Sequence, residues 1–158
     1  MKNITKKESE VTYEKKFLTI AAILTLLLSG CQANHVTDIS TYSADIAKAQ
    51  EITVVSADTS EVLETVTSKD DIEHFILALD LDKWKLKTLP DQAVEIGSFS
   101  LAQEETIKYG QTDTDGTLHD TATITLYDGS YIGFEIGGLD MTFSVSEDTA
   151  EYLNGYFA

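Results

Sequence analysis

The residues best suited to ligand chemistry lie in an acidic stretch that begins at Asp113. Asp113 and Asp115 alternate with a threonine, a glycine follows, and Asp120 lies four residues after that glycine. Alternating carboxylates ahead of a glycine can surround a calcium ion. An EF-hand loop aligned on these acids would begin at Gln111 and end at Ala122, so both end ligands would be missing. We therefore interpret the stretch as a solvated turn. Asp113, Asp115 and Asp120 remain the metal-ligand candidates, with Ca²⁺ as the ion, and we expect no other cofactor.

A second group of charged residues is the lysine series Lys83, Lys85 and Lys87. The segment 82–87 alternates, so the three ammonium groups would share one face of a strand, opposite an apolar face. This basic face could contact an anionic group. Lysines also protect edge strands from unwanted pairing, and that role is the interpretation we favour.

The sequence lacks the common catalytic signatures. It has no G-x-S-x-G elbow, no H-E-x-x-H pair, no cysteine pair and no glycine-rich phosphate loop. The three histidines, His35, His74 and His119, have no metal-ligand neighbour at helical spacing. We therefore predict that the protein is not an enzyme, and a hydrolase that uses the acids of the 113–120 stretch is the alternative.

Hydrophobic patterning predicts the elements that would position these residues. The β-branched runs at 51–57 and 61–67 indicate two strands joined by a turn. Ser68 is a suitable N-cap for a helix that extends to Leu79 with one apolar stripe. A further strand is expected at 82–87, two short strands or one bent strand at 94–102 and 106–109, and an exposed loop at 110–119.

Apolar pairs in the last forty residues predict a three-stranded meander. A three-residue loop over 127–129, with Gly129 left-handed, keeps the apolar residues of the first hairpin on one face. A two-residue turn over 138–139 does the same for the second hairpin. The expected partners are Ala122 with Phe134, Ile124 with Ile132, Phe134 with Phe143, and Ile132 with Val145.

A final helix should follow Ser146, with Ala150, Leu153 and Phe157 on the side that packs on the meander. Strands dominate the chain order and helices are few. The predicted fold class is therefore α+β: a mainly antiparallel sheet of five to seven strands with two helices packed on one face.

Charge restricts the classes of partner. The chain has 27 acidic residues against 11 lysines and no arginine, which gives a net charge of −16. Such a chain repels phosphate backbones, so we exclude nucleic acid as a partner. It attracts cations, and a cationic protein or peptide is the partner class that we expect.

The segment that ends at Cys31 carries a localisation signal. Lysines precede an uncharged run of twelve residues, Phe17–Leu28, and the chain's single cysteine follows soon after. Twelve helical residues rise about 18 Å, which is too short for a hydrocarbon core of ~30 Å. Leu28-Ser29-Gly30-Cys31 resembles the lipobox of bacterial lipoproteins, namely a branched apolar residue, two small residues and a cysteine.

This resemblance implies signal-peptide cleavage between Gly30 and Cys31 and a diacylglycerol with palmitate-like chains on the Cys31 sulfur. Two acyl chains are enough for stable anchoring. The expected domains are a signal peptide at 1–30, the lipidated cysteine and a flexible tether at 31–49, and one globular α+β domain at 50–158. A short helical turn within 43–50 is the alternative for the end of the tether. Loss of five lysines and three glutamates with the signal peptide would change the net charge from −16 to −18.

These features together predict the location and role of the protein. We expect a lipid-anchored lipoprotein on the extracytoplasmic face of the cell membrane, acting as a non-enzymatic binding module of the cell envelope. Its charge suggests an alternative, an acidic inhibitor or decoy for cationic envelope hydrolases or antimicrobial peptides. The architecture is similar to small α+β domains found behind lipoboxes in low-GC Gram-positive bacteria, and this loose resemblance assigns no functional residue.

Overall fold

The computed structural model describes residues 39–105, 107, 110 and 112–158, which contain three α-helices and seven strands. Two single 3₁₀ turns, Leu81–Lys83 and Gly155–Phe157, follow α3 and α4. The helices and strands in chain order are α2 (Ser40–Ile46), β1 (Glu51–Ser56), β2 (Val62–Val66), α3 (Lys69–Ala78), β3 (Lys85–Leu86), β4 (Glu95–Glu104), β5 (Leu118–Tyr127), β6 (Tyr131–Ile136), β7 (Leu139–Ser144) and α4 (Glu147–Asn154).

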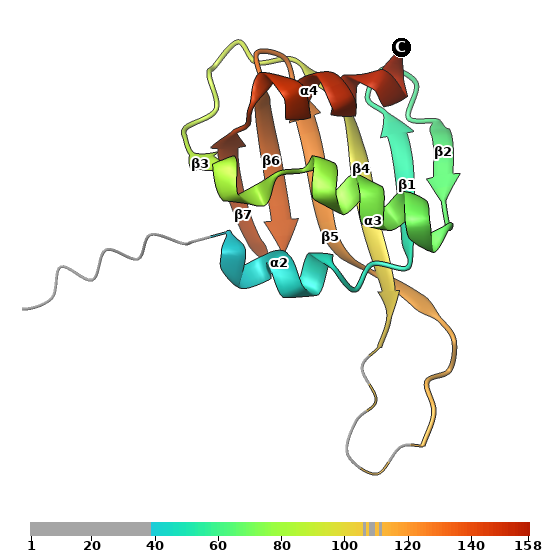
Figure 1. Cartoon of the computed structure of the whole chain (residues 1–158). Coiled ribbons are helices and arrows are strands. Elements are labelled where there is room, and N and C mark those ends of the chain that lie inside the picture. Colours follow the sequence, from blue (N-terminus) through green and yellow to red (C-terminus); the bar gives the residue numbers. More distant parts are fainter. Residues whose placement is uncertain (1–38, 106, 108–109, 111) are drawn as a thin grey trace, which may run out of the picture. The chain divides into compact units, whose positions relative to one another are not determined.

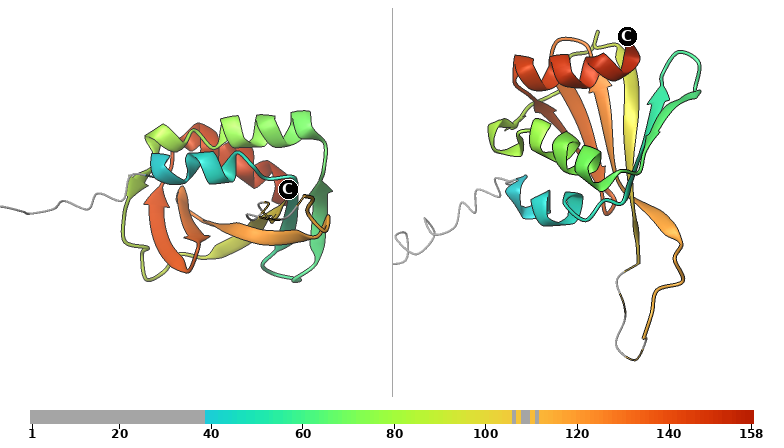
Figure 2. Two further views of the ribbon diagram at one scale, coloured as in Figure 1. Left: turned by 90° about the horizontal axis from the view of Figure 1, so that it is seen from below. Right: turned by 45° about the vertical axis from the view of Figure 1, so that its right-hand side comes forward.

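All seven strands belong to one antiparallel sheet, in the order β2-β1-β4-β5-β6-β7-β3. Figures 1 and 2 show α2, α3 and α4 on the same face of this sheet. The α+β class and the mainly antiparallel sheet are therefore confirmed. The described residues add a third helix, α2, to the two that the sequence predicted.

The core lies between the helices and the sheet. Alternate residues in β6 and in the second half of β5 are buried, as a strand with one covered face requires. Phe75 of α3 packs on Phe99 of β4 with 5.2 Å between ring centroids, and Trp84 packs on Phe134 of β6 at 5.8 Å. The buried Trp84 Nε1 donates to the Leu79 carbonyl at 2.7 Å, so the indole enters the core with its polar atom paired.

Helix α2 belongs to this core, although a flexible tether was expected there. Ile39 and Ile46 are only 5% and 1% exposed, and the Tyr42 ring lies 6.1 Å from the Phe134 ring. Positions 39, 42 and 46 follow the spacing of one helical stripe, which the polar residues between them hide in the sequence. The described core therefore includes residues from Ile39 onward and is not limited to 50–158.

The second hairpin of the meander keeps the predicted buried face but has a different register. Gly137 and Gly138 form its turn, with φ angles of 57° and 80°. Tight two-residue hairpins favour positive φ at both central residues, which suits Gly-Gly better than the predicted Gly-Leu. As a result, Phe134 pairs with Met141 and not with Phe143.

The first hairpin of the meander is shifted in the same way. Its loop covers residues 128–130 instead of 127–129, and Gly129 is left-handed as predicted, with a φ angle of 69°. Ile124 consequently pairs with Phe134 rather than with Ile132. A shift of two residues returns every side chain to its own face, so the burial pattern is satisfied in both registers.

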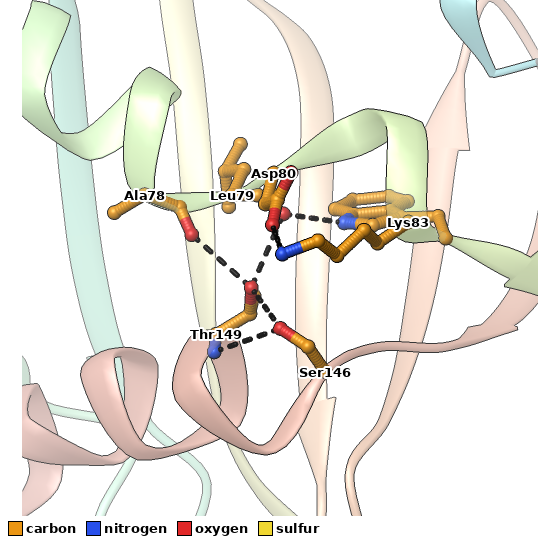
Figure 3. Close-up of polar contacts among 7 residues, drawn as sticks. Ala78, Leu79, Asp80, Lys83, Ser146 and Thr149 are labelled. Carbon is orange, nitrogen blue, oxygen red and sulfur yellow. Dashed lines mark hydrogen bonds and ion pairs between the residues drawn. The ribbon is translucent and has the colours of Figure 1, made fainter.

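Helix α4 is joined to the end of α3 through Thr149, which is 2% exposed. The Thr149 hydroxyl lies within donating distance of two carbonyl oxygens, 3.2 Å from Ala78 and 3.4 Å from Leu79, and it accepts from Ser146 Oγ at 2.9 Å (Figure 3). Ser146 Oγ also accepts the Thr149 N–H at 3.2 Å, which confirms the predicted N-cap. One buried hydroxyl thus connects two helix ends.

Replacement of this hydroxyl should weaken the domain measurably. Thr149→Val keeps the side-chain shape but leaves the Ala78 carbonyl without its side-chain donor. We expect the free energy of unfolding to fall by about 1–2 kcal/mol in urea denaturation. Thr142→Val makes the same change at a half-buried site in β7 and should stay within about 0.5 kcal/mol of wild type. Equal effects of the two substitutions would contradict the role given to Thr149.

The close packing of the C-terminus on β4 gives a second prediction. A Cβ at Gly97 would lie 2.5 Å from the Val55 carbonyl oxygen and would overlap the Phe157 ring. Gly97→Ala should therefore lower the free energy of unfolding by about 1–3 kcal/mol. Gly155→Ala is the matched control, because nothing lies within 4 Å of its Cβ position and its φ of −57° suits alanine. A neutral Gly97→Ala would show that Phe157 does not occupy this position in solution.

Candidate functional site

The structure brings two of the three predicted metal ligands to one cleft and places the third elsewhere. Asp113 and Asp115 line a small cleft of about 270 Å³, whereas Asp120 lies in β5 and lines a different cleft. Asp115 Oδ1 accepts the Thr117 N–H at 2.9 Å, and this hydrogen bond lowers the pKa of Asp115. Among the described residues, no group of three Asp, Glu, His or Cys side chains could hold a metal ion. The acidic stretch therefore forms a turn closed by its own backbone.

The three lysines of the predicted basic face are also separated. Leu81–Lys83 form a 3₁₀ turn rather than a strand, and Lys83 Nζ binds Asp80 Oδ2 at 2.6 Å. Lys85 and Lys87 follow at β3, the last strand of the sheet, and neither has an ion pair among the described residues. Two lysines at a two-residue edge strand fit the edge-protecting interpretation better than a shared binding face does.

The remaining predicted site, the cleavage and lipidation position at Gly30 and Cys31, lies outside the described residues, as does the apolar run at 17–28. In the part of the chain that the structure describes, no helix combines the length and apolar character needed to cross a bilayer. The anchor therefore stays a prediction from the sequence.

A cleft that sequence patterns did not predict opens where β6 ends. The pairing of β5 with β6 stops at Ala122 and Ile136, because the chain turns at Gly137. On its other side β5 stays paired with β4 as far as Leu118. Figure 1 shows this pair of strands continuing past the end of β6, beside α2. The cleft lies in the corner that this difference in strand length creates.

Carboxylates make up three of the six polar residues that line this cleft, which we call the acidic cleft. It has a volume of about 630 Å³, within the range of ligand sites, and is lined by α2, β4, β5, β6 and the β6–β7 turn. Asp45 comes from α2, Asp120 from β5 and Glu135 from β6. No lysine or histidine of the described residues lines it.

Two of these three carboxylates have no compensating charge. Asp45 is paired with Lys48 at 2.7 Å, and because both side chains are more than half exposed the pair contributes little to stability. It nevertheless cancels the charge of Asp45. Within the described residues, neither Asp120 nor Glu135 has a side-chain hydrogen bond or an ion pair. The acidic cleft thus adds a local negative potential to the negative field of the whole chain.

Gln103 of β4 lines this cleft and also a neighbouring one. Its Oε1 atom is buried and has no hydrogen-bond partner among the described residues. A buried carbonyl oxygen without a donor costs about 1–3 kcal/mol, and a water or a ligand N–H would remove that cost. The uncompensated charges of Asp120 and Glu135 favour a ligand that is positively charged and donates hydrogen bonds.

Sequence reasoning missed most of this cleft. It singled out Asp120 as a metal ligand but gave no role to Gln103 or Glu135, which are distant in sequence and meet only through the sheet register. The sequence feature that could have indicated the cleft is the Gly137-Gly138 pair, which sets the end of β6. Its consequence for β5 could be seen only once the strand lengths were known.

A second polar cluster lies between α3 and the C-terminus. The Tyr152 and Tyr156 hydroxyls are 2.9 Å apart, and His74 Nδ1 lies 3.4 Å from the Tyr152 hydroxyl. The Tyr156 ring packs on Phe99 at 5.4 Å and on Phe75 at 6.0 Å. Burial, followed by the hydrogen bond with Tyr152, raises the pKa of Tyr156 far above that of an ordinary tyrosine. These ring contacts hold the helices on the sheet, and we assign the cluster a structural role.

Comparisons with known proteins show little similarity to this chain. No family model matches the chain, and no curated protein matches it. Among solved structures, the crystal structure of a thioesterase-like protein from Clostridium sporogenes matches with a TM-score of 0.38 and 13% identity. The match covers 69% of this chain and 94% of that one.

This neighbour corrects two expectations from the sequence. The chain was predicted to be a non-enzymatic module and not an enzyme, and the neighbour is described as a thioesterase-like protein, which contradicts both predictions. We withdraw them. The likeness is too distant to assign a reaction or a catalytic residue to this chain, and the proposals below use the acidic cleft alone.

The packing of Tyr156 predicts its behaviour at high pH. Because the folded-state pKa lies above the unfolded value of about 10, stability from this group is complete below pH ~10 and falls as the pH rises above it. In a titration followed by phenolate absorbance, one tyrosine should remain protonated after the ordinary ones have ionised. Tyr156→Phe should remove that last transition. Its persistence in Tyr156→Phe would contradict the assignment.

Proposed function

We propose that the chain is a lipid-anchored protein on the extracytoplasmic face of the cell membrane that binds an amine-bearing cationic ligand in the acidic cleft. The observation that carries this proposal is the pair of uncompensated carboxylates, Asp120 and Glu135, in a cleft without a lining cation. A protonated amine would supply the charge that both lack.

Hydrogen bonding supports the same ligand class. An ammonium group has three donors and no acceptor, so it suits a lining whose charged groups are hydrogen-bond acceptors. Gln103 offers a carbonyl oxygen that is buried and unpaired. An anionic ligand would instead meet two like charges and a third acceptor, which disfavours it.

The location is supported by the N-terminal sequence. A lysine-rich start, a short apolar run and the Leu28-Ser29-Gly30-Cys31 lipobox are together typical of lipid-modified exported proteins. Since the acidic chain is repelled by anionic headgroups, a covalent lipid is the physical means by which it would stay at the membrane. Cationic proteins, peptides and polyamines at the cell envelope are then within its reach.

Ligand binding can be measured with spermidine as the probe. We expect calorimetry at low salt to detect binding to the wild type, and an affinity about tenfold lower for the double variant Asp120→Asn/Glu135→Gln, because charge-assisted hydrogen bonds are lost. High salt should weaken the wild-type affinity by screening.

The matched control for this titration is Asp58→Asn/Asp91→Asn. It removes the same two charges from exposed acids outside the acidic cleft. This variant should bind spermidine nearly as well as the wild type does. If both double variants lose affinity equally, binding follows net charge alone and the cleft is not the site.

Lipid anchoring has its own prediction. In bacterial cells that produce the chain, the wild type should take up radioactive palmitate and sediment with membranes. Cys31→Ser replaces the sulfur that would carry the lipid, so it should take up no label and leave the membrane fraction. An unlabelled wild type together with a membrane-bound Cys31→Ser would overturn the lipoprotein assignment.

A further inference from the structure

The acidic cleft contains a free strand edge as well as charge. From Leu118 to Thr121, β5 is flanked by β4 on one side, and no described strand lies on the other side. Such a stretch leaves backbone N–H and C=O groups without partners in the sheet. Asp120 and Thr121 line the cleft, so the half of this edge next to Ala122 faces the space in which a ligand would bind.

The ends of the neighbouring elements leave this edge accessible. Gly137 and Gly138, at the β6–β7 turn, line the cleft without side chains, and both are exposed. β6 would have to continue past Ile136 to pair with this part of β5, and the turn prevents it. A strand that entered from outside could take the place that a longer β6 would have occupied.

Backbone pairing and charge together define the chemistry of such a ligand. An added strand gains affinity from main-chain hydrogen bonds and specificity from its alternate side chains. A basic side chain on that strand would enter the cleft lined by Asp120 and Glu135, which lack a cation. A free polyamine could use the charges but not the strand edge.

We propose that the ligand of the acidic cleft is an extended peptide segment that pairs its backbone with the free edge of β5 at Leu118–Thr121 and places a lysine or arginine side chain against Asp120 and Glu135. This inference depends on the proposed function, because it names the ligand class of the same cleft. It adds one requirement that a small amine does not have, namely free backbone N–H groups on the ligand.

Three kinds of short synthetic peptide separate these requirements. The first, acetyl-Thr-Val-Lys-Val-Thr-amide, carries one charge on a strand-forming backbone. The second kind has the same sequence with N-methyl groups on every other backbone nitrogen. Two such peptides are made, one for each alternate set of nitrogens, so that pairing is blocked and charge is kept. The third has an acetylated lysine, so that pairing is kept and charge is lost.

Binding to the full folded domain would be measured by calorimetry and by amide chemical shifts. We expect the first peptide to bind, to shift the amides of Leu118–Thr121 and to slow their hydrogen exchange. One of the two N-methylated peptides should bind about tenfold more weakly than the first peptide, and so should the peptide with the acetylated lysine. The Asp120→Asn/Glu135→Gln variant should bind the lysine peptide about tenfold more weakly, with amide shifts outside the cleft unchanged, which shows that it is folded.

Three results would overturn the proposal, and they differ in whether the proposed function also fails. If both N-methylated peptides and spermidine bind as well as the first peptide, the cleft holds an amine but no strand, and the proposed function stands. If the peptide binds equally to the wild type and the double variant, it binds elsewhere. If neither peptide nor spermidine binds, the inference and the proposed cation site both fail.

Discussion

Two consecutive glycines determine where β6 ends, and both the acidic cleft and the free edge of β5 depend on that end point. Gly137 and Gly138 adopt the positive φ angles of a tight hairpin and end β6 at Ile136. β5 has no such limit and remains paired with β4 as far as Leu118. This difference in length opens the acidic cleft, leaves part of β5 with a free edge and brings Glu135 to the lining. Neither strand alone would create a site.

The domain compensates its acidic residues in some places and leaves them uncompensated in others. Asp70 and Asp71 occupy the first turn of α3, and Glu147 and Asp148 occupy that of α4, where the helix dipole stabilises negative charge. Three described lysines are engaged in ion pairs within their own segment. The cleft receives neither form of compensation at Asp120 or Glu135. Its unmet charge is therefore a local property and not simply a share of the net charge.

Local sequence signals predicted the elements, whereas the cleft depends on how they assemble. Ser68 and Ser146 cap α3 and α4 as expected, because a cap involves only residues within one turn. Both hairpins of the meander differ from prediction by two residues, since an alternating pattern cannot distinguish registers two apart. The packing of α2 in the core was not predicted, because polar residues hide its apolar stripe. The cleft could not be predicted because it arises from unequal lengths of neighbouring strands.

Amide hydrogen exchange along β5 tests the free strand edge most directly. From Ala122 to Tyr127 the strand has a partner on both sides, so all of its amides should be protected. From Leu118 to Thr121 only the amides directed at β4 should be protected, and those directed away should exchange nearly as fast as in an unstructured peptide. Protection of every amide from Leu118 to Thr121 in the free protein would show that another segment covers this edge, and would contradict both the open cleft and the site proposed in it.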